Sequence, residues 1–144
     1  NNYTSYTKES IVPIYDIVYI KGNPSSGTPL LHEKINHSII ELIEEYKYIT
    51  IDSEHKNLSN IQIPKAKIYI GFSRGSRYLK KLDSSSLKIS IGGISGSKIH
   101  IFKNSKDNIL LGDISISSMQ AHFVISNEDK IKIKVLIDNF LKVG

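Results

Sequence analysis

The stretch Lys67-Ile68-Tyr69-Ile70-Gly71-Phe72-Ser73-Arg74-Gly75 decides the fold of this chain. Its first four residues are β-branched or aromatic apart from one lysine, which is typical of a buried strand. The strand pattern runs directly into a Gly-x-Ser-x-Gly turn, and the residues beyond it, as far as Leu82, are compatible with a helix. The stretch therefore predicts a strand, a tight turn at Ser73 and a helix in immediate succession.

Three further apolar runs are predicted as strands of the same sheet: Ile17–Ile20, Tyr48–Ile51 and Ile99–Phe102. Their near-continuous apolarity is typical of parallel strands that helices cover on both faces. A helix between the first two runs is indicated by one apolar stripe, made up of Ile35, Ile39, Leu42, Ile43 and Tyr46. A strand, a helix and a second strand in this order predict a β-α-β unit.

The second half of the chain has a less regular pattern. Leu87–Ile91 and His122–Ile125 are weaker strand candidates, because serine and histidine interrupt them. Ser126 followed by Asp129 predicts the cap of a C-terminal helix. The apolar stripe of that helix is formed by Ile133, Leu136, Ile137, Phe140 and Leu141.

The connection 92–97 is short for a parallel sheet. It has six residues, whereas a parallel crossover takes a dozen or more. The segment 87–102 is therefore either an unusually short crossover or a local hairpin. We expect an α/β fold in which residues 1–144 form a single three-layer domain with a mainly parallel sheet of about six strands.

Composition excludes several kinds of site and partner. The chain has no cysteine, so disulfides, thiolate metal sites and a cysteine nucleophile are excluded. No apolar run approaches the ~18 residues of a membrane-spanning helix, and residues 1–10 lack the order of a signal peptide. We therefore expect a cytoplasmic protein with no membrane partner. The net charge is +5, but the lysines are scattered, so we expect a generic basic surface and no nucleic-acid partner.

Ser73 has the setting of a nucleophile, because a sharp strand-to-helix turn exposes a serine at the edge of a sheet. Side chains two residues to either side would collide with neighbouring backbone, so glycine is needed at Gly71 and Gly75. The same turn brings the backbone N–H of Arg74 to the start of the helix, where it can bind an oxyanion. A purely structural Gly-Ser turn is the alternative.

A serine nucleophile needs a base, and the base needs an acid that orients it. After such a turn the acid precedes the base in the chain. His100 lies in the middle of a predicted strand, so His122, which follows an irregular serine-rich segment, is the better base. Asp107 follows the strand that contains His100, and if the strands are parallel it lies at the same edge as Ser73. We therefore assign the acid to Asp107, with Asp113 as the runner-up.

The stretch Lys21-Gly22-Asn23-Pro24-Ser25-Ser26-Gly27 follows the first predicted strand and resembles the His-Gly-Asn-Pro-type loop of the α/β-hydrolase superfamily, with Lys21 in place of histidine. Asn104–Ile109 resembles the family's Gly-x-x-Asp turn, and Ala121-His122-Phe123 resembles its Gly-His-Phe segment, each without the expected glycine. The resemblance implies a minimal, lid-less hydrolase fold in which the backbone N–H of Asn23 is the second oxyanion donor. A phosphate-binding loop is the alternative, but the stretch lacks the Lys-Ser/Thr ending of a P-loop.

We therefore expect a serine hydrolase that acts on an ester, thioester or related acyl bond. Its catalytic residues would be Ser73, His122 and Asp107, with Asn23 and Arg74 binding the oxyanion. It would take a small-molecule acyl substrate and need no cofactor and no metal. An open site can be completed by a neighbouring subunit, so a homo-oligomer is compatible with this expectation. The alternative function is a catalytically inactive hydrolase-fold protein that acts in binding or as a scaffold.

Overall fold

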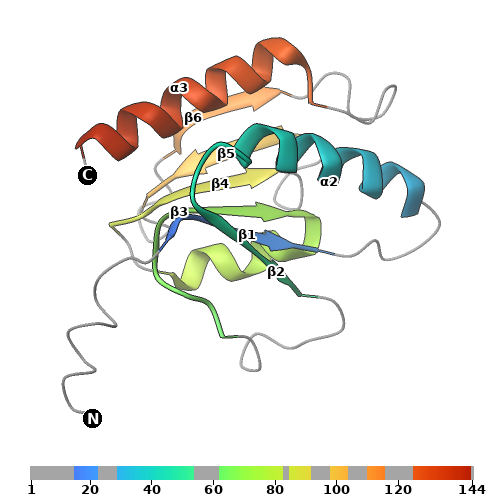
Figure 1. Cartoon of the computed structure of the whole chain (residues 1–144), viewed down its shortest axis with the longest axis horizontal. Coiled ribbons are helices and arrows are strands. Elements are labelled where there is room, and N and C mark those ends of the chain that lie inside the picture. Colours follow the sequence, from blue (N-terminus) through green and yellow to red (C-terminus); the bar gives the residue numbers. More distant parts are fainter. Residues whose placement is uncertain are drawn as a thin grey trace.

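The structure is a computed structural model, and it describes residues 15–22, 29–53, 62–82, 85–91, 98–103, 110–115 and 125–143. Figure 1 shows the arrangement of the elements. In chain order they are β1 (Tyr15–Lys21), α2 (Pro29–Ile43), β2 (Tyr48–Asp52), β3 (Ala66–Phe72), the 3₁₀ helix η2 (Ser73–Lys81), β4 (Leu87–Ile91), β5 (Lys98–Phe102), β6 (Leu110–Ser115) and α3 (Asn127–Val143).

The strands form a six-stranded sheet in the order β2-β1-β3-β4-β5-β6. β1 pairs in parallel with β2 and β3, and β3 pairs in parallel with β4. β5 pairs in antiparallel fashion with both of its neighbours, so it runs against the direction of the other five strands. The predicted α/β class with a mostly parallel sheet is confirmed, and the segment 87–102 forms a hairpin.

The strand β6 was not predicted. Its sequence, Leu-Leu-Gly-Asp-Ile-Ser, has a glycine and an aspartate in the middle, and both residue types are depleted in strands. It is a strand because β5 offers an antiparallel partner a few residues back in the chain. Asp113, the runner-up for the acid, lies within β6. Of the weaker strand candidate His122–Ile125, residues 122–124 lie outside the described residues and Ile125 is not in a strand.

Helices cover both faces of the sheet, which gives three layers (Figure 1). α2 and α3 lie on one face, where they share a buried core with strand residues such as Ile17 and Tyr19. η2 lies on the other face, where its buried side chains join the intervening residues, among them Val18 and Ile20. Successive residues of a strand point to opposite faces. The near-continuous apolarity of β1 therefore reflects burial on both sides.

Small residues allow η2 to lie close to the sheet. A methyl group added at Gly71 would come within 2.7 Å of the Cα atom of Ser76 in η2, so glycine is needed there as expected. On the same side of η2, the hydroxyl of Ser90 in β4 donates a hydrogen bond of 2.9 Å to the hydroxyl of Ser76. These contacts fix η2, and with it the turn at Ser73, on β3 and β4.

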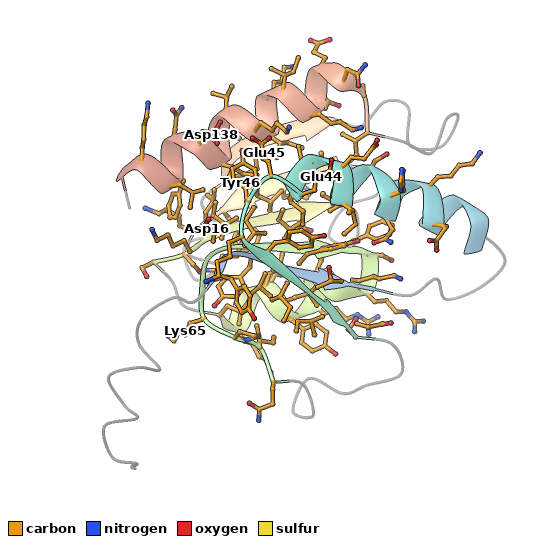
Figure 2. The ribbon with its side chains drawn as sticks, viewed as in Figure 1. Asp16, Glu44, Glu45, Tyr46, Lys65 and Asp138 are labelled. Carbon is orange, nitrogen blue, oxygen red and sulfur yellow. The ribbon has the colours of Figure 1, made fainter. Side chains whose placement is uncertain are left out.

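Polar contacts fix the ends of the two long helices. The hydroxyl of Ser126 accepts a 3.1 Å hydrogen bond from the backbone N–H of Asp129, which confirms the predicted cap of α3. Tyr46, just after α2, donates a 2.7 Å hydrogen bond to Asp138 of α3, and Figure 2 shows the two side chains side by side. Among the described helices, none is long and apolar enough to cross a membrane.

Candidate active site

Ser73 directly follows β3 and is the first residue of η2, so the chain turns at this residue. Phe72 before it is extended, with φ −118° and ψ 127°, whereas Ser73 has φ 55°. Within the described part of the chain it is the one residue other than glycine with a positive φ. This left-handed conformation costs a residue with a side chain roughly 1–2 kcal/mol, so surrounding contacts must hold it. The serine is half-buried, and its position on a tight turn after β3 is as predicted.

Two glycines bring the end of β1 against this turn. A methyl group on Gly75 would lie 2.1 Å from the carbonyl oxygen of Ile20. One on Gly22 would lie 2.6 Å from the backbone nitrogen atoms of Arg74 and Gly75. The obstructing atoms belong to the backbone, so they cannot move aside as a flexible side chain can. Both positions therefore require glycine, which was predicted for Gly75. For Gly22, the signal was its place directly after the first strand.

The backbone N–H of Arg74 lies near the start of η2, which is the position that the predicted oxyanion role requires. The first N–H groups of a helix have no partner within the helix, and Arg74 is the second residue of η2. Gly22 packs against the same nitrogen atom, so the chain that continues into Asn23 leaves β1 beside this N–H. Asn23 itself lies outside the described residues.

Ser53, at the end of β2, holds this end of β1 in place. Its backbone N–H and its hydroxyl both donate to the carbonyl oxygen of Lys21, over 3.0 Å and 2.7 Å. The carbonyl belongs to the peptide group that enters Gly22, so Ser53 fixes the orientation of the backbone at the turn. Nothing in the sequence pattern singled out Ser53, because a lone serine after a strand has no distinctive spacing.

The expected location of Asp107 rested on a parallel β5, and that premise is wrong. β5 is antiparallel, with Ile91 paired to Ile99 and Lys88 paired to Phe102. The chain therefore leaves β5 at the edge opposite Ser73. Phe102 is also paired to Leu110, so β6 begins at that same opposite edge. Both Asp107 and His122 lie outside the described residues.

His100 lies in β5 as predicted and is buried, with 7% of its surface exposed. It is paired with Ser90 of β4 on one side and with Asp113 of β6 on the other. Ser90 is fully buried and bonded to Ser76 of η2. His100 is thus part of the packed layer beneath η2, within a strand as predicted.

Tyr19 of β1, on the face of the sheet that α2 covers, lies close to the acidic residues Glu33 and Asp52. The hydroxyl of Tyr19 donates a 2.6 Å hydrogen bond to the side-chain oxygen of Asn36. Burial raises the pKa of Tyr19 far above its usual value, and the negative charges of Glu33 and Asp52 raise it further. The phenol therefore stays protonated and serves as a permanent donor that ties β1 to α2.

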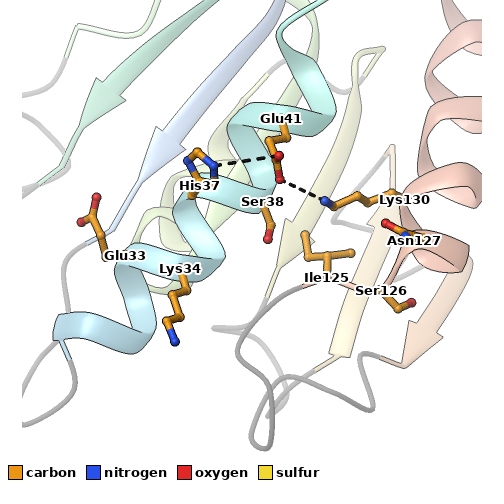
Figure 3. Close-up of a pocket in the computed structure, with 9 residues that line it drawn as sticks. All are labelled: Glu33, Lys34, His37, Ser38, Glu41, Ile125, Ser126, Asn127 and Lys130. Atoms are coloured by element: carbon orange, nitrogen blue, oxygen red, sulfur yellow. Dashed lines mark hydrogen bonds and ion pairs between the residues drawn. The ribbon is translucent and has the colours of Figure 1, made fainter.

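A hollow of about 560 Å³ lies between α2 and the start of α3, and Figure 3 shows its lining. Glu41 is one of the lining residues, and its carboxylate lies 3.2 Å from Lys130 Nζ and 3.9 Å from His37 Nε2. Its described lining includes neither Ser73 nor Arg74. The hollow and the turn are therefore separate features, and the backbone geometry of the turn carries the stronger chemical signal.

The described residues hold no group of three or more His, Asp or Glu side chains suited to a metal ion. No protein-family model matches the chain, and no curated protein or solved structure is significantly similar to it. The geometry around Ser73 is therefore the basis on which function is inferred.

Proposed function

We propose that this protein is a serine hydrolase with a minimal, lid-less α/β-hydrolase fold, and that it acts on an ester, thioester or related acyl bond. The observation that supports this most is the left-handed conformation of Ser73 between a buried parallel strand and a helix, at φ 55°. Such strain is maintained where the surrounding structure enforces it, and here Gly22 packs against backbone atoms of Phe72 and Arg74, on either side of Ser73. A serine in this geometry presents its hydroxyl at the edge of the sheet.

The proposed reaction uses the serine as a nucleophile in two steps. Ser73 Oγ attacks the acyl carbon while His122 Nε2 takes its proton, and the backbone N–H groups of Arg74 and Asn23 stabilise the resulting oxyanion. The C–O or C–S bond to the leaving group breaks as His122 returns the proton to it. Water then attacks the acyl-serine with His122 again as the base, which releases the acid and restores Ser73.

We assign the acid that orients His122 to Asp113 rather than Asp107. β6 runs in the same direction as β3. Its register brings the Cα atom of Asp113 level with that of Gly71, across β4 and β5. Three strand spacings of about 4.8 Å separate the two positions, and the proposal requires the imidazole of His122 to bridge them above β4 and β5. The strand before Asp107, in contrast, ends at the opposite edge.

Labelling with a fluorophosphonate probe tests the nucleophile. The wild-type protein should be labelled at one serine, and Ser73→Ala should lose the label completely. Ser76→Ala is the matched control, because Ser76 lies in the same helix but faces the sheet and bonds to Ser90. This control should keep the label. A folded wild-type protein that the probe leaves unlabelled would favour the inactive binding or scaffold alternative.

A further inference from the structure

The exposed side of η2 is a row of positive charges that starts next to Ser73. The buried residues of η2 are Gly75, Ser76, Tyr78 and Leu79, and its exposed cationic residues are Arg74, Arg77, Lys80 and Lys81. A 3₁₀ helix has three residues per turn, so Arg74, Arg77 and Lys80 lie above one another on one side. We call these three residues the η2 cation row. The alignment of all three residues on one side follows from the 3₁₀ geometry of η2, which the sequence pattern did not predict.

The two arginines of the row have no structural role on the described chain. Neither Arg74 nor Arg77 forms an ion pair or hydrogen bond with a described residue, whereas Lys130 and Lys134 pair with carboxylates of the segment 41–45. Positive charge in the first turns of a helix also opposes the helix dipole. Within the described residues, the two guanidinium groups are therefore not engaged in stabilising η2, and a ligand can meet them at the exposed surface beside Ser73.

We propose that the substrate of the Ser73 site carries a negative charge on its acyl chain, which binds the guanidinium group of Arg77. This inference rests on the proposed hydrolase function. Arg77 is four residues beyond Ser73, and at a rise of about 2 Å per residue its Cα atom lies roughly 8 Å along η2. An acyl chain of about six carbons spans that interval, so a terminal carboxylate can meet the guanidinium while its carbonyl carbon faces Ser73. Arg74 adds positive charge between the two.

A set of three esters tests the proposal: 4-nitrophenyl hexanoate, the mono-4-nitrophenyl ester of adipic acid, and 3-carboxy-4-nitrophenyl hexanoate. The first is neutral, the second is charged on the acyl chain and the third on the leaving group. We expect kcat/KM for the adipate ester to exceed that for the neutral ester by on the order of tenfold at low salt. The ester charged on its leaving group should be preferred over the neutral ester by a smaller factor. Addition of 0.5 M NaCl should reduce the preference for each charged ester.

Variants of Arg77 connect the preference to this side chain. Arg77→Gln should lower the ratio of adipate to hexanoate kcat/KM about fivefold, Arg77→Glu should reverse it, and Arg77→Lys should keep most of it. Lys142→Gln is the control, because it removes the same charge from an exposed position on α3 and should leave the ratio unchanged. Equal ratios in wild type and Arg77→Glu would overturn the proposal while leaving the hydrolase function intact. Hydrolysis that is absent, or that Ser73→Ala retains, would instead overturn the hydrolase function itself.

Discussion

The two halves of the sheet differ in how they relate strand ends to the candidate site. In the half formed by β2, β1, β3 and β4, every strand runs the same way, so Ser53, Gly22 and Ser73 all follow strand ends at one edge. In the half formed by β5 and β6, the direction alternates, with β5 antiparallel to β4 and β6 antiparallel to β5, so only every second strand ends there. The edge of the sheet at which a residue after a strand lies can thus be predicted only when the direction of that strand is known.

The largest effect expected concerns the antiparallel half. If β6 supplies the acid, Asp113→Asn should lower turnover by on the order of 10³- to 10⁴-fold, because the orienting carboxylate fixes the tautomer of the base. Asp107→Asn should keep most of the activity. Both variants are assayed on an activated ester that wild type hydrolyses, with circular dichroism as the check on folding. The reverse ranking would return the role to Asp107, and equal, mild effects would argue that no triad operates.

The parallel half should be the less tolerant of added atoms. Gly75→Ala would bring a methyl group to 2.1 Å from the Ile20 carbonyl oxygen, and we expect a loss of about 3 kcal/mol in the free energy of unfolding. Ile101→Val, in the antiparallel half, removes one methylene group and should cost about 1 kcal/mol. Urea unfolding monitored by circular dichroism measures both. Similar small losses in the two variants would mean that the end of β1 does not pack on the turn as described.

The strain at Ser73 can be measured by two substitutions at the same position. Both Ser73→Ala and Ser73→Gly should lose the fluorophosphonate label. Glycine adopts φ 55° without the penalty that alanine suffers, so Ser73→Gly should unfold with a free energy about 1 kcal/mol higher than Ser73→Ala. Thermal and urea unfolding give the comparison. Equal stabilities would indicate that the turn relaxes to a negative φ in solution.

The smallest effect is expected at Ser53. Ser53→Ala removes the hydroxyl bond to Lys21 but keeps the backbone N–H bond to the same oxygen, so we expect a loss of about 1 kcal/mol or less. Because the affected peptide leads into Gly22, ester hydrolysis should fall several-fold as well. Thr50→Ala, at an exposed position of the same strand, serves as the control. If Ser53→Ala is as active as this control, the hydroxyl bond from Ser53 does not influence the geometry of the turn at Ser73.

The parallel half could be predicted from sequence because local pattern and tertiary environment agree there. Strands buried on both faces are continuous in apolar residues, as in Ile17–Ile20, and the Gly-x-Ser-x-Gly spacing fixed the turn at Ser73. The helices were predictable from their apolar stripes, and the Ser126 cap of α3 from its spacing to Asp129. In each case the residues that carry the signal are close together in the chain.

The antiparallel half could not be predicted in the same way. β6 contains Gly112 and Asp113, and its conformation comes from pairing with β5 rather than from its own residues. The direction of β5 depends on the connection 92–97. The length of that connection was compatible with both a short parallel crossover and a hairpin. The two arginines of the η2 cation row are visible in the sequence as basic residues close to Ser73, but their alignment with Lys80 appears only once η2 is known to be a 3₁₀ helix. These features depend on which strands and helices pack together, and the local sequence pattern of a single segment does not contain that information.

The contact between Gly22 and Gly75 joins segments about fifty residues apart in the chain, whereas β4, β5 and β6 pair with neighbours a few residues away. Closing a long loop costs more entropy than closing a short one, so contacts between distant segments form more slowly. The hairpins can therefore form early in folding, while the left-handed turn at Ser73 becomes fixed only when β1 docks beside β3. Recovery of probe labelling during refolding should accordingly lag behind recovery of sheet structure.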